Sequence, residues 1–124
     1  DVYKRQPLPS PGPQWRNGMR LRAEVMLQTR TQLSVPFAAV TRLAGQSFVY
    51  VVGDRAQLLA RPGRADLKLV RRLPAQTRFA LQVPVQLGGL QNERYPVLRG
   101  LQPGQDVITS GLLQLRHGLP VTTR

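Results

Sequence analysis

The sequence contains no cysteine and a single histidine. Without cysteine, disulfide bonds, thiolate chemistry and thiolate zinc sites are excluded. The one histidine, His117, lies between Arg116 and Gly118, and no GxSxG motif supplies a nucleophile that it could activate, so we interpret it as a turn residue. Neither GxxxxGK[ST] nor GxGxxG occurs, so no motif indicates a nucleotide site. The sequence therefore predicts a protein that is not an enzyme.

Acidic residues and long apolar runs are also scarce. The sequence contains six acidic residues and 18 lysines and arginines, which gives a net charge of +12 over 124 residues. The acids are scattered, so we expect no metal site and no cofactor. The longest apolar run, residues 35–40, is far shorter than the roughly 20 residues that span a bilayer. The positive charge, nearly all from arginine, suits nucleic acid, an acidic partner or an anionic membrane surface.

The first six residues, DVYKRQ, differ in composition from the rest of the chain. One codon spelling of these residues matches the transposase end tag used in making sequencing libraries. We therefore expect residues 1–6 to be a sequencing-tag artefact and exclude them from fold reasoning. The alternative interpretation is an ordinary basic terminus. An assembled locus that encodes DVYKRQ in frame without a nearby tag would disprove the hypothesis.

Glycine and proline, 11 of each, divide the remaining sequence into short segments. Strict alternation of apolar and polar residues in RLRAEVML and RFALQVPVQ indicates half-buried strands. The segment SFVYVVG, which comes after a turn at Gly45, indicates the second strand of a hairpin. Residues 61–78 fit both a helical turn and a strand. Further strands are expected at 56–60, 94–98, 105–110 and 119–122. Many short strands separated by turns predict an all-β fold, a small antiparallel roll or barrel.

Three blocks of sequence carry a family pattern. RNGMRLRAEV is followed by LSVPFAAVTRLAGQSFVYVV and then by VPVQLGGLQNERYPVLRGLQPGQDVITSGLLQLRHGLPV. In this order they resemble the C-terminal region of periplasmic adaptors, also called membrane fusion proteins, of RND-type tripartite efflux pumps. The sequence departs from the family at Asn17, where proline is usual, and at Gln105, where an acid is usual and Asp106 comes next instead. The stretch 61–78 is also longer and more basic than the family pattern.

The resemblance implies a domain organisation and a function. Residues 33–124 would form the membrane-proximal β-roll, and residues 7–32 would be the C-terminal end of an incomplete β-barrel domain, with its last strand near 19–28. The chain would be a C-terminal fragment of an adaptor in the periplasm, associated with the inner membrane. Its partners would be an inner-membrane transporter, an outer-membrane channel reached through other regions, and further copies in a ring, most often six-fold. The expected structural turns lie at Gly18, Gly45, Gly88, Pro103, Gly104, Gly111 and Gly118.

A basic stretch is the candidate contact surface. Five bases lie within twelve residues, together with one acid, Asp66. A loop at this place in a membrane-proximal roll could reach the transporter or anionic lipid. The alternative is a solvated basic loop without a partner. The five predicted contact residues are Arg61, Arg64, Lys68, Arg71 and Arg72.

The alternative function is a basic small β-barrel that binds nucleic acid. Single-strand binding by such a barrel combines a charged groove with aromatic stacking platforms. The aromatic residues are spread singly along the sequence, without the cluster typical of RNA-recognition motifs. This spacing counts against nucleic acid as the partner.

Overall fold

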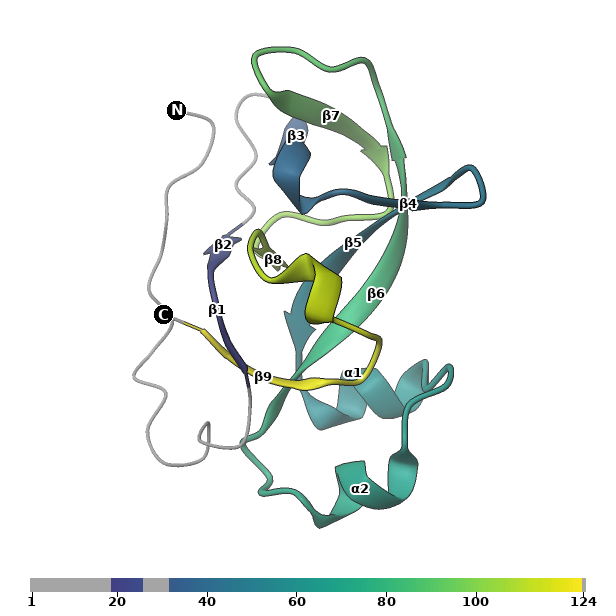
Figure 1. Cartoon of the computed structure of the whole chain (residues 1–124), viewed down its shortest axis with the longest axis vertical. Helices are drawn as coiled ribbons and strands as arrows, with labels where there is room; N and C mark the ends of the chain where they lie inside the picture. The colour runs from purple at the N-terminus through teal and green to yellow at the C-terminus, as the bar shows by residue number, and fades with distance from the viewer. Residues whose placement is uncertain (1–18, 26–31, 124) are drawn as a thin grey trace.

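The computed structural model describes residues 19–25 and 32–123. Nine strands, two short α-helices and two 3-10 turns succeed one another along this part of the chain (Figure 1). In chain order they are β1 (Met19–Leu21), β2 (Ala23–Val25), β3 (Leu33–Pro36), η2 (Phe37–Ala39), β4 (Thr41–Leu43), β5 (Gln46–Gly53), α1 (Arg55–Ala60), α2 (Leu67–Arg72), β6 (Arg78–Leu87), β7 (Arg94–Arg99), β8 (Asp106–Ile108), η3 (Leu112–Gln114) and β9 (Pro120–Thr123).

The strands form a sheet that nearly closes into a barrel. The main order is β1-β9-β6-β5-β8-β2, with β4 paired to β5 and with β7 joining β3 to β6. β1 runs parallel to β9, whereas β2 runs antiparallel to β8. β1 and β2 stand at the two ends of this strand order, yet only Arg22 separates them in the chain. The two edges of the sheet are therefore connected by one short segment. The predicted all-β roll or barrel is confirmed.

β5 and β6 form the centre of the sheet and divide the core in two. They pair over seven residues, from Ser47 opposite Val85 to Gly53 opposite Phe79. Because side chains alternate along a strand, Phe79 and Leu81 enter one apolar cluster, which also contains Leu58 of α1 and Val70 of α2. Ala80 enters the second cluster on the other face. The second face of this strand is thus buried at Ala80, whereas Pro84 and Gln86 farther along the same face are exposed.

The prediction of a third strand at residues 56–60 is wrong, because this segment lies in α1. The Asp54 side chain accepts a hydrogen bond from the Gln57 N–H at 2.8 Å, and the Gln57 side chain accepts one from the Asp54 N–H at 2.9 Å. This reciprocal capping box satisfies backbone donors that a helix start leaves unpaired. Leu58 then buries the inner face of the helix. Asp54 three residues before Gln57 was the sequence signal for a helix.

The stretch 61–78, for which a helical turn and a strand were both expected, contains the second helix. Asp66 caps α2 by accepting a hydrogen bond from the Leu69 N–H at 3.2 Å. Val70 is the buried residue of this helix. None of the described helices is long and apolar enough to cross a membrane.

The predicted turn residues lie between or beside the elements. Gly45 joins β4 to β5, Gly88 comes directly after β6, and Gly111 precedes η3. Pro103 and Gly104 lie in the turn before β8, and Gly118 lies in the turn before β9, whereas Gly18 is outside the described residues.

The described part of the predicted barrel-domain segment, 7–32, consists almost entirely of β1 and β2. Both strands pair with strands of the segment 33–124. Residues 26–31 lie outside the described residues, so the predicted boundary between two domains stays a prediction. What the structure establishes is that residues 19–25 complete the sheet of the roll.

Gly100 lies in the turn after β7. We expect it to tolerate substitution by alanine less well than Gly104 and Gly89 do. Its φ is +114°, and an added Cβ would lie 2.5 Å from the Pro84 carbonyl oxygen. Gly100→Ala therefore combines backbone strain with a clash, and we expect it to lower the free energy of unfolding by more than about 2 kcal/mol. Urea denaturation of purified variants measures the change.

Two other glycines serve as matched controls. Gly104 has a φ of +92° with nothing within 4 Å of an added Cβ, and Gly89 has equal space without a positive φ. Alanine should cost about 1 kcal/mol at Gly104, from strain alone, and less than about 0.5 kcal/mol at Gly89. Equal stability of the three alanine variants would contradict the account of this turn.

Candidate functional site

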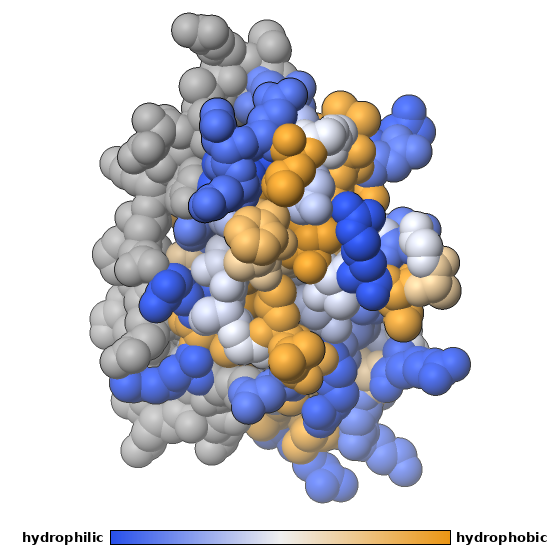
Figure 2. Space-filling view, turned by 45° about the horizontal axis from the view of Figure 1, so that its top comes forward, coloured by the Kyte–Doolittle hydropathy of each residue, from blue (hydrophilic) through white to orange (hydrophobic). Residues whose placement is uncertain are grey.

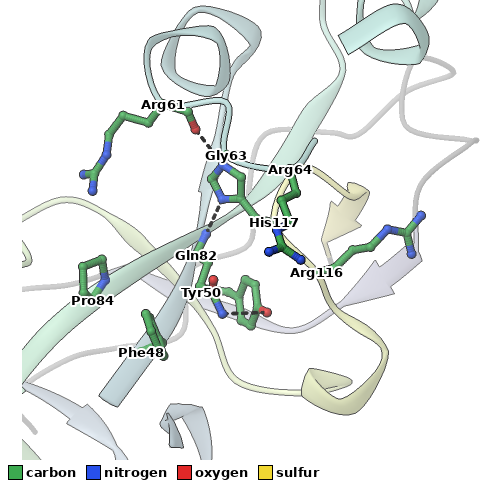
Figure 3. A pocket seen from close by; sticks show the side chains of 9 residues that line it. All are labelled: Phe48, Tyr50, Arg61, Gly63, Arg64, Gln82, Pro84, Arg116 and His117. Carbon is green, nitrogen blue, oxygen red and sulfur yellow. Dashed lines mark hydrogen bonds between the residues drawn. The ribbon is translucent and has the colours of Figure 1, made fainter. Parts of the chain in front are cut away.

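An open groove of ≈ 800 Å³ lies where β5 and β6 pass the loop between the two helices, the α1–α2 loop (residues 61–66). Figure 3 shows the side chains that line it. None of these nine described residues is acidic, and three are arginines, so we call it the arginine groove. It is lined by Phe48, Tyr50, Arg61, Gly63, Arg64, Gln82, Pro84, Arg116 and His117.

The strands supply the floor of the groove. Phe48 lies directly opposite Pro84, and Tyr50 directly opposite Gln82, in the β5–β6 register. The Tyr50 ring is buried, with 5% exposure, and its hydroxyl contacts the Gln82 side-chain nitrogen at 3.4 Å and the Leu115 carbonyl at 3.5 Å. Burial raises the pKa of the Tyr50 hydroxyl, and the Gln82 hydrogen bond partly opposes this shift. The phenol therefore stays neutral at neutral pH, and it donates its hydrogen bond to the Leu115 carbonyl.

His117 connects the floor to the α1–α2 loop. Its Nδ1 accepts a hydrogen bond from the Gln82 backbone N–H at 2.9 Å, and its Nε2 lies 2.7 Å from the Arg61 carbonyl oxygen. Because Nδ1 acts as an acceptor, the ring proton of the neutral imidazole is on Nε2 and is donated to Arg61. Figure 3 shows the ring between these two partners. His117 lies in a turn, as expected, but it also holds the loop against β6.

Two close approaches keep the α1–α2 loop in place. A Cβ added at Gly63 would lie 3.2 Å from the His117 ring, and one added at Gly118 would lie 2.5 Å from the Ala65 Cβ. A larger residue at either position would push the loop off the imidazole and the turn beneath it. The sequence meets this requirement with glycine at both contact points.

The structure divides the five predicted contact residues into two groups. Arg61 and Arg64 line the arginine groove. Lys68, Arg71 and Arg72 lie on α2 with exposed side chains and are not part of the groove. The predicted basic stretch therefore extends beyond the groove.

Sequence reasoning missed several residues of the groove. Arg116 joins the two arginines of the loop although it is 52 positions or more away in the sequence. The positions of Phe48 and Tyr50, two residues apart on a predicted strand, indicated that they share a face. Their meeting with Gln82 and Pro84 depends on the pairing of β5 with β6, for which the sequence carried no direct signal.

Two acidic residues close to the loop in the sequence have structural roles. Asp54 and Asp66 cap the two helices. No group of three or more histidine, aspartate or glutamate side chains within residues 19–25 and 32–123 could hold a metal ion. The electrostatic character of the groove is therefore set by its arginines.

Comparisons of the chain with protein-family models, with curated proteins and with solved structures give no match. What the groove binds must therefore be inferred from its own residues.

Replacing His117 by phenylalanine keeps a planar ring but removes both hydrogen bonds. The Gln82 N–H, which is partly buried, loses its acceptor, so we expect the free energy of unfolding to fall by about 1–3 kcal/mol. Amide hydrogen exchange at Gln82 should accelerate. The control is Arg116→Gln, an exposed neighbour whose change should stay within about 0.5 kcal/mol. Unchanged exchange at Gln82 in the phenylalanine variant would show that the ring does not bridge these groups.

Asp106 provides a pH test of the sheet. Its side chain on β8 is half-buried, and burial raises the pKa of its carboxyl above the ordinary value. The folded state therefore binds this proton more tightly than the unfolded chain does. The resulting stability is complete below the ordinary pKa of about 3.9 and is lost as the pH rises through the raised value. Asp106→Asn should melt above the unmodified protein at pH 7, and the difference should vanish near pH 3.

The matched control is Glu93→Gln, which removes the same charge from an exposed side chain in the turn before β7. This variant should show no gain in melting temperature at pH 7. Equal gains in both variants would assign the effect to net charge rather than to burial of Asp106.

Proposed function

We propose that this chain is a non-catalytic binding module, the membrane-proximal roll of a periplasmic adaptor of an RND-type efflux pump. In this proposal the adaptor links an inner-membrane transporter to an outer-membrane channel and assembles as a ring, most often six-fold. Rigid strands present loops to partners in such a module, because loops on a fixed scaffold carry most contacts.

One observation carries the proposal. The residues that give the sequence its family resemblance occupy positions that the roll requires for its backbone and its core. Gly104, Gly111 and Gly118 have φ values of +92°, +70° and +88°, which favour glycine. Val107 and Val121 are 0% and 1% exposed. The spacing of the pattern is thus what a nearly closed roll of these short strands needs, which supports membership in a family built on such a roll.

The surface also suits a binding role. Figure 2 shows apolar side chains in a band bordered by hydrophilic ones on one face of the molecule. Several large apolar side chains are exposed in the described chain, among them Leu43 at 65%, Leu98 at 63% and Leu113 at 103%. Apolar contacts within a polar rim are typical of protein interfaces. The exposed bases of α2 would add contacts to carboxylates or to anionic lipid.

Nucleic acid receives less support from the groove. Phe48 and Tyr50 do lie together beside arginines. Single-strand binding uses successive exposed rings as stacking platforms. Since the Tyr50 ring is buried, Phe48 alone among the described aromatic residues of the groove offers a partly exposed ring.

The direct test is deletion of the gene in the organism that carries it. The adaptor function predicts higher intracellular accumulation of a fluorescent efflux substrate such as ethidium, restored by the plasmid-borne gene. It also predicts that the protein cross-links in the cell to a multi-spanning transporter. Unchanged ethidium accumulation together with no transporter cross-link would refute the proposed function.

Within this function, the bases of the α1–α2 loop and α2 are expected to contact the transporter or the membrane. Arg64→Glu, Arg71→Glu and Arg72→Glu combined should lower transporter cross-linking and drug resistance, because each base near an anionic surface contributes about 1 kcal/mol. Immunoblotting should show unchanged protein level and export.

The control reverses three exposed arginines on other elements, Arg20, Arg22 and Arg99. It changes the net charge by the same amount and should leave cross-linking and resistance intact. If the first triple variant also keeps full cross-linking and resistance, the basic stretch is a solvated surface without a partner.

A further inference from the structure

We propose that the arginine groove is a binding site for a small amphiphilic anion. The anionic head, a carboxylate or phosphate, would lie among the arginines, and the apolar body would cover Phe48 and Pro84. This site stands independently of a role in efflux, because it is inferred from the groove alone.

The size of the groove fits a small molecule. Its volume of ≈ 800 Å³ lies within the range of about 300–1,000 Å³ that is typical of ligand sites. It lies against β5 and β6, which pair continuously along this stretch. A rigid sheet as the floor makes the groove largely preformed.

The charge of the groove is one-sided. Arg61, Arg64 and Arg116 are exposed and line it together, and no described lining residue is acidic. Asp54, directly before α1, and Asp66, the last residue of the loop, accept hydrogen bonds from helix backbone groups. The positive charge is thus left for a ligand, and guanidinium groups bind carboxylate and phosphate through paired hydrogen bonds.

The apolar part of the site is a cross-strand pair. Phe48 is half-buried and Pro84 is exposed, and the two are directly opposite each other in the sheet. Figure 3 shows them side by side at one end of the groove, with Arg64 extending from the loop toward Tyr50 and Gln82. Between the arginines and the apolar pair lies the Gln82 carboxamide, whose oxygen can accept a hydrogen bond from a polar linkage of the ligand.

The arginine-bearing loop is held before any ligand arrives. The His117 ring contacts the Arg61 carbonyl at 2.7 Å and the Gln82 N–H at 2.9 Å, and Gly63 lies against the ring. A loop already fixed loses little conformational entropy on binding, which favours affinity. Only the arginine side chains would have to become ordered.

The test titrates the purified chain with decanoate, with decanol and with acetate, monitored by NMR chemical shifts. Decanoate carries both parts of the proposed ligand, decanol the apolar body alone and acetate the head alone. We expect saturable decanoate binding with shifts at Phe48, Gln82 and Arg64, and at least about ten-fold weaker binding of each partial probe. Equal binding of decanol would reduce the site to an apolar slot, and equal binding of acetate to a simple anion patch. Either result overturns the proposal.

Two double variants of equal charge locate the site. Arg61→Gln with Arg64→Gln should weaken decanoate binding about ten-fold. Arg71→Gln with Arg72→Gln removes the same charge from α2, outside the groove, and should change the affinity by less than about two-fold. Equal weakening by both pairs would show a non-specific charge effect. If the first pair perturbs the fold, the Pro84→Ser variant replaces it in the test. This variant should weaken the binding of decanoate but not that of acetate.

A macromolecular occupant is the competing outcome. Oligothymidylate and an oligoglutamate peptide are titrated under the same conditions and at two salt concentrations. Binding of either one at the groove more tightly than decanoate would overturn the small-molecule assignment in favour of a nucleic acid or an acidic protein partner.

Discussion

The arrangement of the site depends on the side chain of His117. It accepts a backbone hydrogen bond from β6 at a position where a neighbouring strand would otherwise supply the acceptor. β9 pairs with β6 at Arg78 and Phe79, and the Gly118 N–H still reaches the Ala80 carbonyl at 2.7 Å. Two residues further along β6, the Gln82 N–H meets the His117 Nδ1 rather than a backbone carbonyl. The other ring nitrogen bonds the α1–α2 loop. A buried or partly buried N–H requires an acceptor, so the imidazole continues the ladder and fixes the loop at once.

The groove results from this constraint. Once the loop is held at the Arg61 carbonyl, its arginines lie above the β5–β6 surface, and the glycines at 63 and 118 allow the close packing that keeps them there. Two of the acids cap the helices, and none of the described residues that line the groove is acidic. Arg116, distant in the sequence, thereby joins Arg61 and Arg64 in one groove beside an apolar pair.

Much of the fold was predictable because its strands carry a clear period of two. Phe79, Leu81 and Val85 share the face that their alternation predicted, and Gly45 marks the β4–β5 turn. Helix α1 was missed and α2 was left open between helix and strand, because six-residue segments are too short to show a helical period, although Asp54 and Gln57 carried a capping signal for α1. Only Arg61 and Arg64 of the groove were predicted. His117 contacts partners 35 and 56 positions away, and contacts of this kind depend on sheet register rather than on local sequence.

The central claim is that a neutral His117 bridges β6 and the α1–α2 loop, and nitrogen-15 NMR of the imidazole tests it most directly. The account predicts the Nε2–H tautomer at neutral pH, with an unprotonated Nδ1 that shows a through-hydrogen-bond coupling to the Gln82 amide nitrogen. A proton on Nδ1, or a freely averaging pair of tautomers without that coupling, would contradict the account.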